Sequence, residues 1–452
     1  MTIIVWPHQF SGIVRVPASK SHTIRRLLIA TMANGVSVIE HPLDCLDTRS
    51  CLSVCRALGA EITEEPYRWI VDGGMQSRSS KGINCNVGNS GTTLFLALAI
   101  AALGTEPVVF DGDAQIKRRS AGPLLDALSG LGVYVKSANG CVPVTVRGPW
   151  KGGRVSLPCP TSQYLSALLL AAPLAAAGVV TEIDVPLLNE KPYIEMTLSY
   201  LDSQGVPYKA EKDFSHFHLP GGFSWRPVNG PVPGDFSSAA FPAAAAVITG
   251  GEATLLGLDP GDTQGDKAFF TFLEKMGCTV QWEEVKLGQS AGEWHAAEER
   301  QLCVSRPGSL LAGEFDLNDT PDLLPALAAV ACFAHGDTAL TNVASARIKE
   351  TDRIAAMSEE LAKLGVKTTA HPDALIVHGQ GQNPAEGGKE GGYKQGNQRE
   401  GNIRLDGRGD HRVFMALASA ALGFHSPAEI GGAESANVTY PGFLGLLGAG
   451  LV

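Results

Sequence analysis

Six stretches rich in small apolar residues recur along the chain, and each closes at a glycine. They predict helices over Ser21–Gly35, Gly91–Gly104, Gln163–Gly178, Ser237–Gly250, Asp322–Gly336 and Asp410–Gly423. The closing glycines are 69, 74, 72, 86 and 87 residues apart. Glycine is a common helix stop because it adopts the left-handed backbone conformation without a steric penalty. A period of this length predicts a chain built from copies of one supersecondary unit.

A second, more amphipathic helix follows each apolar one and also ends at a glycine, namely Gly59, Gly132, Gly205, Gly277, Gly365 and Gly448. Apolar β-type runs lie between the two helices, as at Val36–Ile39, and paired runs follow the second helix, as at Val133–Lys136 and Val142–Val146. Each unit therefore reads strand–helix–strand–helix–strand–strand. An unrelated series of α/β elements is the alternative, which successive spacings of 73, 73 and 72 residues disfavour. Pro173, inside one predicted helix, does not fit the scheme.

The repeat also predicts how the chain divides. The sixth unit reaches Val452 before its final strands, whereas Thr2–Val16 holds spare strand-like runs. We expect this N-terminal segment to complete the C-terminal unit. Three units then form a first domain over residues 20–231, and the other three form a second over residues 1–19 plus 232–452, with a hinge near 18–20 and 229–233. Two longer periods indicate surface insertions, around Val285–Arg300 and Gly381–Asn402.

Composition narrows the class of protein. The hydrophobic share of 44% and the charged share of 18% are typical of a globular chain. A net charge of −10 disfavours a general nucleic-acid binder. We find no run of about 20 uncharged apolar residues, and Met1–Phe10 lacks the pattern of a signal peptide. Nine cysteines without a Cys-x-x-Cys pair favour reduced core residues and a cytoplasmic location.

Polar residues gather at the starts of the apolar helices, where free N–H groups favour anions. The segments are Ser19–Ser21, Asn89–Thr92, Thr161–Gln163, Pro321-Asp322 and Asp410–Arg412. Helix capping accounts for the hydroxyls, amides and carboxylates equally well. It does not account for Lys20 or Arg412, because a cation opposes the helix dipole there and needs an anion nearby.

The second helices add further charge at their starts. Lys117–Arg119 and Lys349–Arg353 each fit an anion site or an ordinary solvated surface, and we leave both interpretations open. Asp47–Arg49 is interpreted as a structural ion pair. His216 and His218 lie on one strand face without a third ligand, so no metal site is expected.

Several motifs occur in a fixed order along the whole chain. They are Pro17–Ser21, Gly88–Thr92, Lys191–Ile194, Gln264–Asp266, Lys349–Arg353, Asp410–Arg412 and Tyr440-Pro441. In these the chain resembles the 5-enolpyruvylshikimate-3-phosphate synthases, which move the enolpyruvyl group of phosphoenolpyruvate onto shikimate 3-phosphate and release phosphate. The resemblance implies an α/β (α+β) fold, a two-domain inside-out α/β barrel with three repeats in each domain.

The resemblance also implies the site. Positions matched to phosphoenolpyruvate binding are Lys20, Gly91, Arg119, Gln163, Arg353 and Arg412. Positions matched to shikimate 3-phosphate binding are Lys20, Ser21, Arg25, Thr161, Ser162, Gln163, Tyr193, Asp322, Ser345 and Lys349. Arginine suits such ligands because it pairs phosphates and carboxylates through two parallel hydrogen bonds.

The chemistry requires a base for the attacking hydroxyl and an acid for the methylene carbon. Asp322 is the candidate base and Glu350 the candidate acid, with Lys20 as an alternative proton carrier that the sequence cannot separate from them. We expect no metal or organic cofactor, no nucleic-acid or membrane partner, and a monomer.

Four residues depart from the family pattern. Phe95 stands where an arginine is common, Val438 where a lysine is frequent, and Glu190 and Ser345 replace the usual serine and asparagine. Two other functions therefore remain in view: enolpyruvyl transfer to UDP-N-acetylglucosamine, and a repeat scaffold without activity. The first usually needs a reactive cysteine on a loop of the first domain, and the matching loop, Asp111–Pro123, has none.

Overall fold

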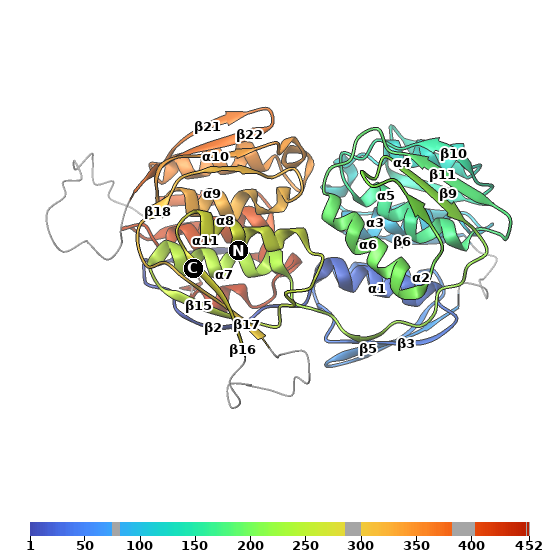
Figure 1. Ribbon diagram of the computed structural model, residues 1–452, viewed down its shortest axis with the longest axis horizontal. Coiled ribbons are helices and arrows are strands. Elements are labelled where there is room, and N and C mark those ends of the chain that lie inside the picture. The colour runs from blue at the N-terminus through green and yellow to red at the C-terminus, as the bar shows by residue number, and fades with distance from the viewer. Residues whose placement is uncertain (75–81, 285–299, 382–402, 449, 452) are drawn as a thin grey trace, which may run out of the picture. The chain divides into compact units, whose positions relative to one another are not determined.

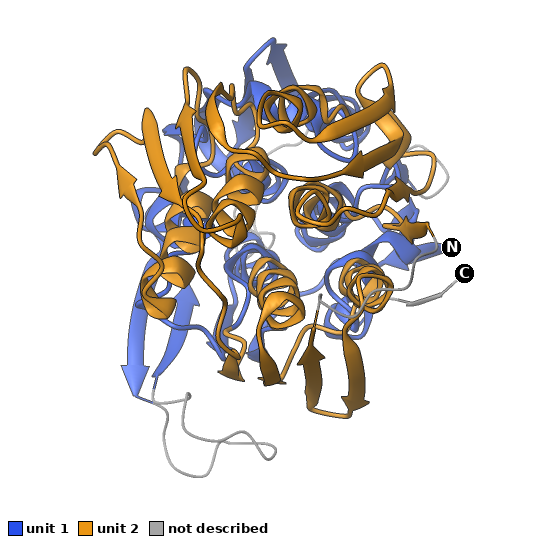
Figure 2. Cartoon of the chain, turned by 90° about the vertical axis from the view of Figure 1, so that its right-hand side faces the viewer, with its two compact units in different colours: residues 1–17, 234–452 blue, residues 18–233 orange. Residues whose placement is uncertain are grey.

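The structure is a computed structural model that describes residues 1–74, 82–284, 300–381, 403–448 and 450–451 (Figure 1). These residues form two compact units, one of residues 18–233 and one of residues 1–17 with 234–452 (Figure 2). Each unit has a hydrophobic core of its own. The expected insertions at 285–300 and 381–402 lie, apart from their end residues 300 and 381, outside the described residues.

The unit of residues 18–233 contains three copies of one motif. The first copy is β14 (Asn229–Pro231), α1 (Lys20–Met32), β3 (Gly35–Glu40), α2 (Leu46–Ala57), β4 (Glu61–Glu65) and β5 (Arg68–Gly73). The second is β6 (Ile83–Asn86), α3 (Gly91–Ala101), β7 (Val108–Asp111), α4 (Gly122–Gly130), β8 (Tyr134–Ala138) and β9 (Cys141–Arg147). The third is β10 (Gly153–Ser156), α5 (Gln163–Ala171), β11 (Val180–Asp184), α6 (Lys191–Gln204), β12 (Lys209–Ala210) and β13 (His216–Pro220).

The other unit contains three further copies. The fourth is β2 (Gly12–Arg15), α7 (Phe236–Thr249), β15 (Glu252–Leu256), α8 (Ala268–Lys275), β16 (Thr279–Glu284) and β17 (Arg300–Ser305). The fifth is β18 (Leu310–Leu311), β19 (Glu314–Asp316), α9 (Leu324–Ala331), β20 (Ala334–Thr341), α10 (Arg353–Lys363), β21 (Lys367–His371) and β22 (Ala374–Gln380). The sixth is β23 (Ile403–Asp406), α11 (His411–Ala421), β24 (Ala428–Gly431), α12 (Phe443–Leu446), β25 (Gly450–Leu451) and β1 (Thr2–Val5).

All six copies build the same small sheet. The opening strand runs parallel to the strand after the first helix, and that strand pairs antiparallel with one strand of a closing antiparallel pair, as in the order β6-β7-β9-β8. The six-repeat expectation, three repeats in each unit, is therefore confirmed. Each described sheet has four or five strands.

The N-terminal segment serves two copies rather than one. β1 pairs with β24, with Thr2 opposite Gly431, and so completes the sixth copy as expected. β2 instead runs parallel to β15 and supplies the opening strand of the fourth copy. This second role was not predicted, because the sequence of a four-residue strand does not indicate which sheet the strand joins.

The first helix of each copy is buried on nearly every face, which explains its small apolar residues. Every residue of α3 and of α7 is buried. α3 packs against α1 and α5, while α7, α9 and α11 pack against one another (Figure 1). Although these helices are apolar, none in the described part of the chain is also long enough to cross a membrane.

The helix ends differ between the two helices of a copy. The glycines after the second helices all adopt left-handed φ angles, between 62° and 105°, as predicted. Most first helices end earlier than predicted. α5 stops at Ala171 and gives way to a 3-10 turn, Ala172–Leu174, because Pro173 has no N–H to continue the helix. Asp322 lies in a 3-10 turn before α9, and Gly336 lies within β20.

Candidate active site

A buried arginine holds three carboxylates together in the unit that contains residues 234–452. Arg353 is the first residue of α10, and its side chain is 1% exposed. Its Nε donates to Asp410 over 2.8 Å, its Nη1 to Asp322 over 2.7 Å and its Nη2 to Glu350 over 2.6 Å. Glu350 and Arg353 are three residues apart, and with side chains 13% and 1% exposed the pair is largely withdrawn from solvent. Charge-assisted bonds thus fix both candidate proton carriers in one geometry.

Two more cations surround Asp322. Arg412 Nη2 lies 3.1 Å from its Oδ2, and Lys349 Nζ lies 3.7 Å from its Oδ1. Burial alone would raise the pKa of Asp322, but the charges of Arg412, Lys349 and Arg353 outweigh it and hold the pKa well below its usual range. Asp322 is therefore ionised at neutral pH, and it is a weak base for as long as these cations remain beside it.

A further carboxyl, that of Asp266, lies beside Arg412. Its Oδ2 accepts a hydrogen bond from Ser237 Oγ and lies 3.8 Å from Arg412 Nη1, while its buried Oδ1 has no hydrogen-bond partner among the described residues. Burial raises the pKa of Asp266 to about 7, with Arg412 opposing and Asp322 adding to the rise. Asp266 and Asp322 thus compete for one guanidinium, and burial favours the protonated form of Asp266.

Asp266→Asn is expected to flatten the dependence of stability on pH. The folded state holds a proton on Asp266 up to a pKa of about 7, whereas the unfolded chain releases it at pH ~4. The stabilisation that comes from this bound proton is therefore lost as pH rises between these two values, and none of it remains at higher pH. Thermal melts at about pH 5 and about pH 8 should show a smaller difference in the variant. Glu274→Gln removes an exposed carboxylate of the same unit as the control. Identical pH dependences in Asp266→Asn and the wild type would contradict the assignment.

Lys20 begins α1 in the other unit, and its partner is Asp47 of α2. Lys20 Nζ lies 3.1 Å from Asp47 Oδ2, and both side chains are largely buried. The ion pair expected within Asp47–Arg49 is wrong in its partner, since Arg49 instead pairs with Asp44 and Glu64. Asp47 is buried on the helix face that meets α1, which leaves Arg49 to reach exposed acids.

Three of the predicted phosphoenolpyruvate residues lie together in this unit. A Cβ on Gly91 would stand 2.5 Å from Arg119 Nη1 and 3.7 Å from Gln163 Oε1, so both side chains cross the start of α3. Gln163 also donates to Thr92 Oγ1 over 2.9 Å. Lys117 and Arg119 have different surroundings, because Lys117 forms an exposed ion pair with Asp111 at 3.3 Å. The surface interpretation therefore suits Lys117 and not Arg119.

From the resemblance to the 5-enolpyruvylshikimate-3-phosphate synthases, Gly91→Ala is expected to weaken phosphoenolpyruvate binding. The new methyl group would displace the end of Arg119, and a charge-assisted hydrogen bond is worth about 1.5–3 kcal/mol, so KM for phosphoenolpyruvate should rise about tenfold or more. Initial rates at varied phosphoenolpyruvate measure it. Gly445→Ala, where an added Cβ meets nothing within 4 Å, is the matched control. An unchanged KM in Gly91→Ala would show that Arg119 does not bind this substrate.

Arg25 forms a second cluster with two more predicted ligands. It is 2% exposed and donates to Ser21 O at 3.2 Å and to Tyr193 O at 3.3 Å. Its other bonds run to the hydroxyls of Thr197 and Ser166, at 3.0 and 3.2 Å. Burial lowers the pKa of Arg25 to about 10. Within the described residues it has hydroxyl and carbonyl partners and no ion pair.

Thr161 and Ser162 meet Glu190 rather than a cation. The Glu190 carboxylate accepts from Thr161 Oγ1 at 3.0 Å, from Ser162 Oγ at 2.9 Å and from Ser162 N at 3.0 Å. Glu190 is 2% exposed and occupies the position before α6. This departure from the family pattern therefore lies directly on two predicted ligands.

The other departures have different surroundings. Phe95 is buried in α3 and packs edge-to-face on Tyr164 with ring centroids 5.1 Å apart, so it has become part of the core. Ser345 is buried in the 3-10 turn Ala344–Ile348, shortly before Lys349. Val438 is half-buried at the end of the 3-10 turn Ala433–Val438.

Sequence reasoning gave Asp266 no role, treated Asp410 only as part of a polar helix start, and paired Asp47 with Arg49 instead of Lys20. Asp410 caps α11 by accepting from Arg412 N at 2.8 Å while it pairs with Arg353. Asp266 and Asp410 fall within motifs that were recognised for other residues. Their signal is a carboxylate at the edge of an apolar segment, where burial demands a cationic or hydrogen-bonding partner.

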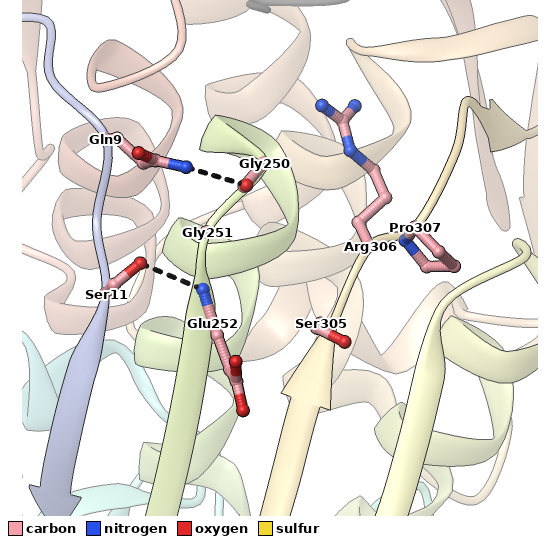
Figure 3. Close-up of a pocket in the computed structure, with 8 residues that line it drawn as sticks. All are labelled: Gln9, Ser11, Gly250, Gly251, Glu252, Ser305, Arg306 and Pro307. Atoms are coloured by element: carbon pink, nitrogen blue, oxygen red, sulfur yellow. Dashed lines mark hydrogen bonds between the residues drawn. The ribbon is translucent and has the colours of Figure 1, made fainter.

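A pocket of about 380 Å³ lies elsewhere, beside the end of α7 (Figure 3). There Gln9 Nε2 donates to Gly250 O over 2.8 Å, and Glu252 N donates to Ser11 Oγ over 3.0 Å. Arg306 also lines it, and burial lowers the pKa of that guanidinium. These bonds tie the N-terminal segment to the fourth copy, and the pocket includes none of the predicted site residues.

Six copies of one α/β motif, with cations and carboxylates at the starts of buried helices, define a repeat enzyme for anionic substrates. The family model for EPSP synthase (3-phosphoshikimate 1-carboxyvinyltransferase) matches residues 5–447. The chain belongs to this family.

Individual proteins agree over the full length. The chain is 43% identical to the 3-phosphoshikimate 1-carboxyvinyltransferase of Acetivibrio thermocellus, over 99% of this chain and 97% of that one. It is 37% identical to the same enzyme of Halobacterium salinarum, over 100% of this chain and 99% of that one. The solved EPSP synthase of Acinetobacter baumannii matches with a TM-score of 0.77 and 25% identity, over 100% of this chain and 98% of that one.

Proposed function

We propose that this chain transfers the enolpyruvyl group of phosphoenolpyruvate to the 5-hydroxyl of shikimate 3-phosphate and releases phosphate, a step of aromatic amino acid biosynthesis. The observation that carries the proposal is the network around Arg353. It holds two candidate proton carriers, Asp322 and Glu350, beside the cations Lys349 and Arg412. An addition–elimination on anionic substrates needs both kinds of group.

The proposed ligands follow the family pattern. Phosphoenolpyruvate contacts Lys20, Gly91, Arg119, Gln163, Arg353 and Arg412. Shikimate 3-phosphate contacts Lys20, Ser21, Arg25, Thr161, Ser162, Gln163, Tyr193, Asp322, Ser345 and Lys349. Arg353 is the most constrained of these, because it is 1% exposed and already donates to three carboxylates. Arg353 donates to a substrate only when its hydrogen bond to Asp322 or to Glu350 is broken.

The proton transfers follow from the same electrostatics. Asp322 accepts the proton of the attacking hydroxyl, and Glu350, in its protonated form, delivers a proton to the methylene carbon. In the elimination Glu350 takes a proton back from that carbon, the bond to phosphate breaks, and Asp322 returns its proton to the departing phosphate. The low pKa of Asp322 makes it a poor base on its own. Anionic substrate groups attract Lys349 and Arg412, and each cation that turns to the substrate raises the pKa of Asp322. Lys20 remains the alternative proton carrier, and its Nζ lies 3.1 Å from Asp47 Oδ2.

We also propose that the two units are domains that close over the substrates. The domains are residues 20–231 and residues 1–19 with 232–452, and the chain crosses near 18–20 and 229–233. The proposed ligands come from both, and anions would draw their cations together. Small-angle scattering should therefore record a smaller radius of gyration with shikimate 3-phosphate and glyphosate, a phosphoenolpyruvate analogue, than without ligand. Identical profiles in both states would count against closure.

Two other functions are distinguished by one assay. Phosphate release from phosphoenolpyruvate is measured with shikimate 3-phosphate, with UDP-N-acetylglucosamine and with neither acceptor. We expect release only with shikimate 3-phosphate, without added metal or cofactor, from a cytoplasmic monomer. Release with UDP-N-acetylglucosamine and not with shikimate 3-phosphate would support enolpyruvyl transfer to UDP-N-acetylglucosamine. The absence of a cysteine in Asp111–Pro123 disfavours that reaction. No release with any acceptor would support an inactive scaffold.

A further inference from the structure

Two hydroxyls that are proposed to bind the acceptor substrate are occupied by a side chain of the protein itself. Thr161 Oγ1 and Ser162 Oγ donate to one carboxylate oxygen of Glu190 at 3.0 and 2.9 Å, and Ser162 N donates to the same oxygen at 3.0 Å. Glu190 and Ser162 are each 2% exposed. Three donors that converge on one oxygen form an anion site, and here the anion is a glutamate.

The backbone brings Glu190 to these donors by a constrained route. Cys159 N donates to Leu187 O at 2.8 Å and Asn189 N to Cys159 O at 3.1 Å, so the two segments run side by side. Glu190 then takes φ 60° and ψ 43°, a left-handed conformation that side chains other than glycine rarely adopt. Strain of this kind persists where the surroundings fix it, and it gathers at functional sites.

A substrate anion and Glu190 cannot use these donors together. Each hydroxyl has one proton to donate, and a phosphate or carboxylate would need the protons that Glu190 now accepts. The two anions would also repel each other at such close range. Arg25, the buried cation of the same unit, forms no ion pair within the described residues. The hydroxyls of Thr161 and Ser162 are thus occupied by Glu190. In the described part of the chain, Arg25 has only hydroxyl and carbonyl partners.

We propose that Glu190 is a gate for the acceptor substrate, that is, a side chain that occupies the acceptor's binding groups until it is displaced. Its side chain must leave Thr161 and Ser162 before an anionic group of shikimate 3-phosphate binds them, and this displacement weakens the affinity for the acceptor. The inference rests on the proposed roles of Thr161 and Ser162. A serine at this position, as in the family pattern, would offer a hydroxyl in place of a competing charge.

The test uses Glu190→Ser and Glu190→Gln in the full-length protein. Calorimetric titration of shikimate 3-phosphate without phosphoenolpyruvate should give a Kd about tenfold lower for the serine variant and a smaller gain for the glutamine variant, which keeps an acceptor oxygen. Inorganic phosphate, titrated as a second probe, should also bind more tightly. KM for phosphoenolpyruvate and kcat should change little. Glu195→Gln, an exposed charge on the same helix α6, should leave every value unchanged.

The opposite result is as clear. An unchanged or higher Kd for shikimate 3-phosphate in both variants, with thermal melts like the wild type, would show that Glu190 orients the hydroxyls and does not block them. A wild type that neither binds nor turns over shikimate 3-phosphate would refute the proposed function instead. In that case, tighter phosphate binding by Glu190→Ser would still support the gate, and unchanged phosphate binding would overturn it.

Discussion

Replacing Arg353 by methionine is expected to lower the free energy of unfolding by about 3–5 kcal/mol, because removal of one partner from a buried ion pair leaves uncompensated charge. Three carboxylates, those of Asp322, Glu350 and Asp410, would lose their shared cation, and Asp410 is fully buried. Methionine fills a similar volume, so the loss reflects charge rather than a cavity. Denaturant unfolding of wild type and variant at neutral pH measures the difference.

A matched surface substitution separates this effect from the general cost of removing an arginine. Arg404 pairs with Glu429 at 3.0 Å, but its side chain is 85% exposed. Arg404→Met should therefore cost no more than about 1 kcal/mol, as for other exposed ion pairs. Equal losses in Arg353→Met and Arg404→Met would contradict the buried network.

Asp322→Asn and Glu350→Gln are each expected to fold and to lose about 10²–10⁴-fold in kcat, the usual contribution of acid–base groups. Both changes keep the shape of the side chain and remove the proton carrier. Initial rates at saturating substrates measure kcat, and thermal melts confirm folding.

Controls make the result specific to these carboxyls. Glu359→Gln, an exposed carboxylate on α10 that pairs with Arg408 at 2.7 Å, should keep kcat unchanged. Lys20→Met tests the remaining proton carrier in the same assay. If Asp322→Asn or Glu350→Gln turns over at the wild-type rate, that residue has no part in proton transfer.

The repeat was predictable from the sequence because glycine spacing and apolar character are local signals. The second helices end at the predicted glycines, and β1 completes the sixth copy as expected. The role of β2 in the fourth copy was not predictable, since strand pairing over hundreds of residues leaves no local trace. The early end of α5 was predictable from Pro173 but not from the glycine spacing, which placed the helix end further along the chain.

The site was predictable in its residue types and not in its partners. Motif order identified the carboxylates and cations around Asp322, but not that Arg353 binds three acids at once. Lys20 was expected to need an anion, yet Asp47 was assigned to Arg49. Such pairings depend on which helix faces meet, and packing decides that only after the chain has folded.

Phosphorus NMR of the enzyme with equimolar phosphoenolpyruvate and shikimate 3-phosphate shows whether this chain joins the enolpyruvyl group to shikimate 3-phosphate. We predict that the phosphoenolpyruvate signal gives way to inorganic phosphate, while the phosphate ester of the acceptor persists in a new enolpyruvyl ether that mass spectrometry identifies. An unchanged spectrum, or phosphate without the ether, would contradict it.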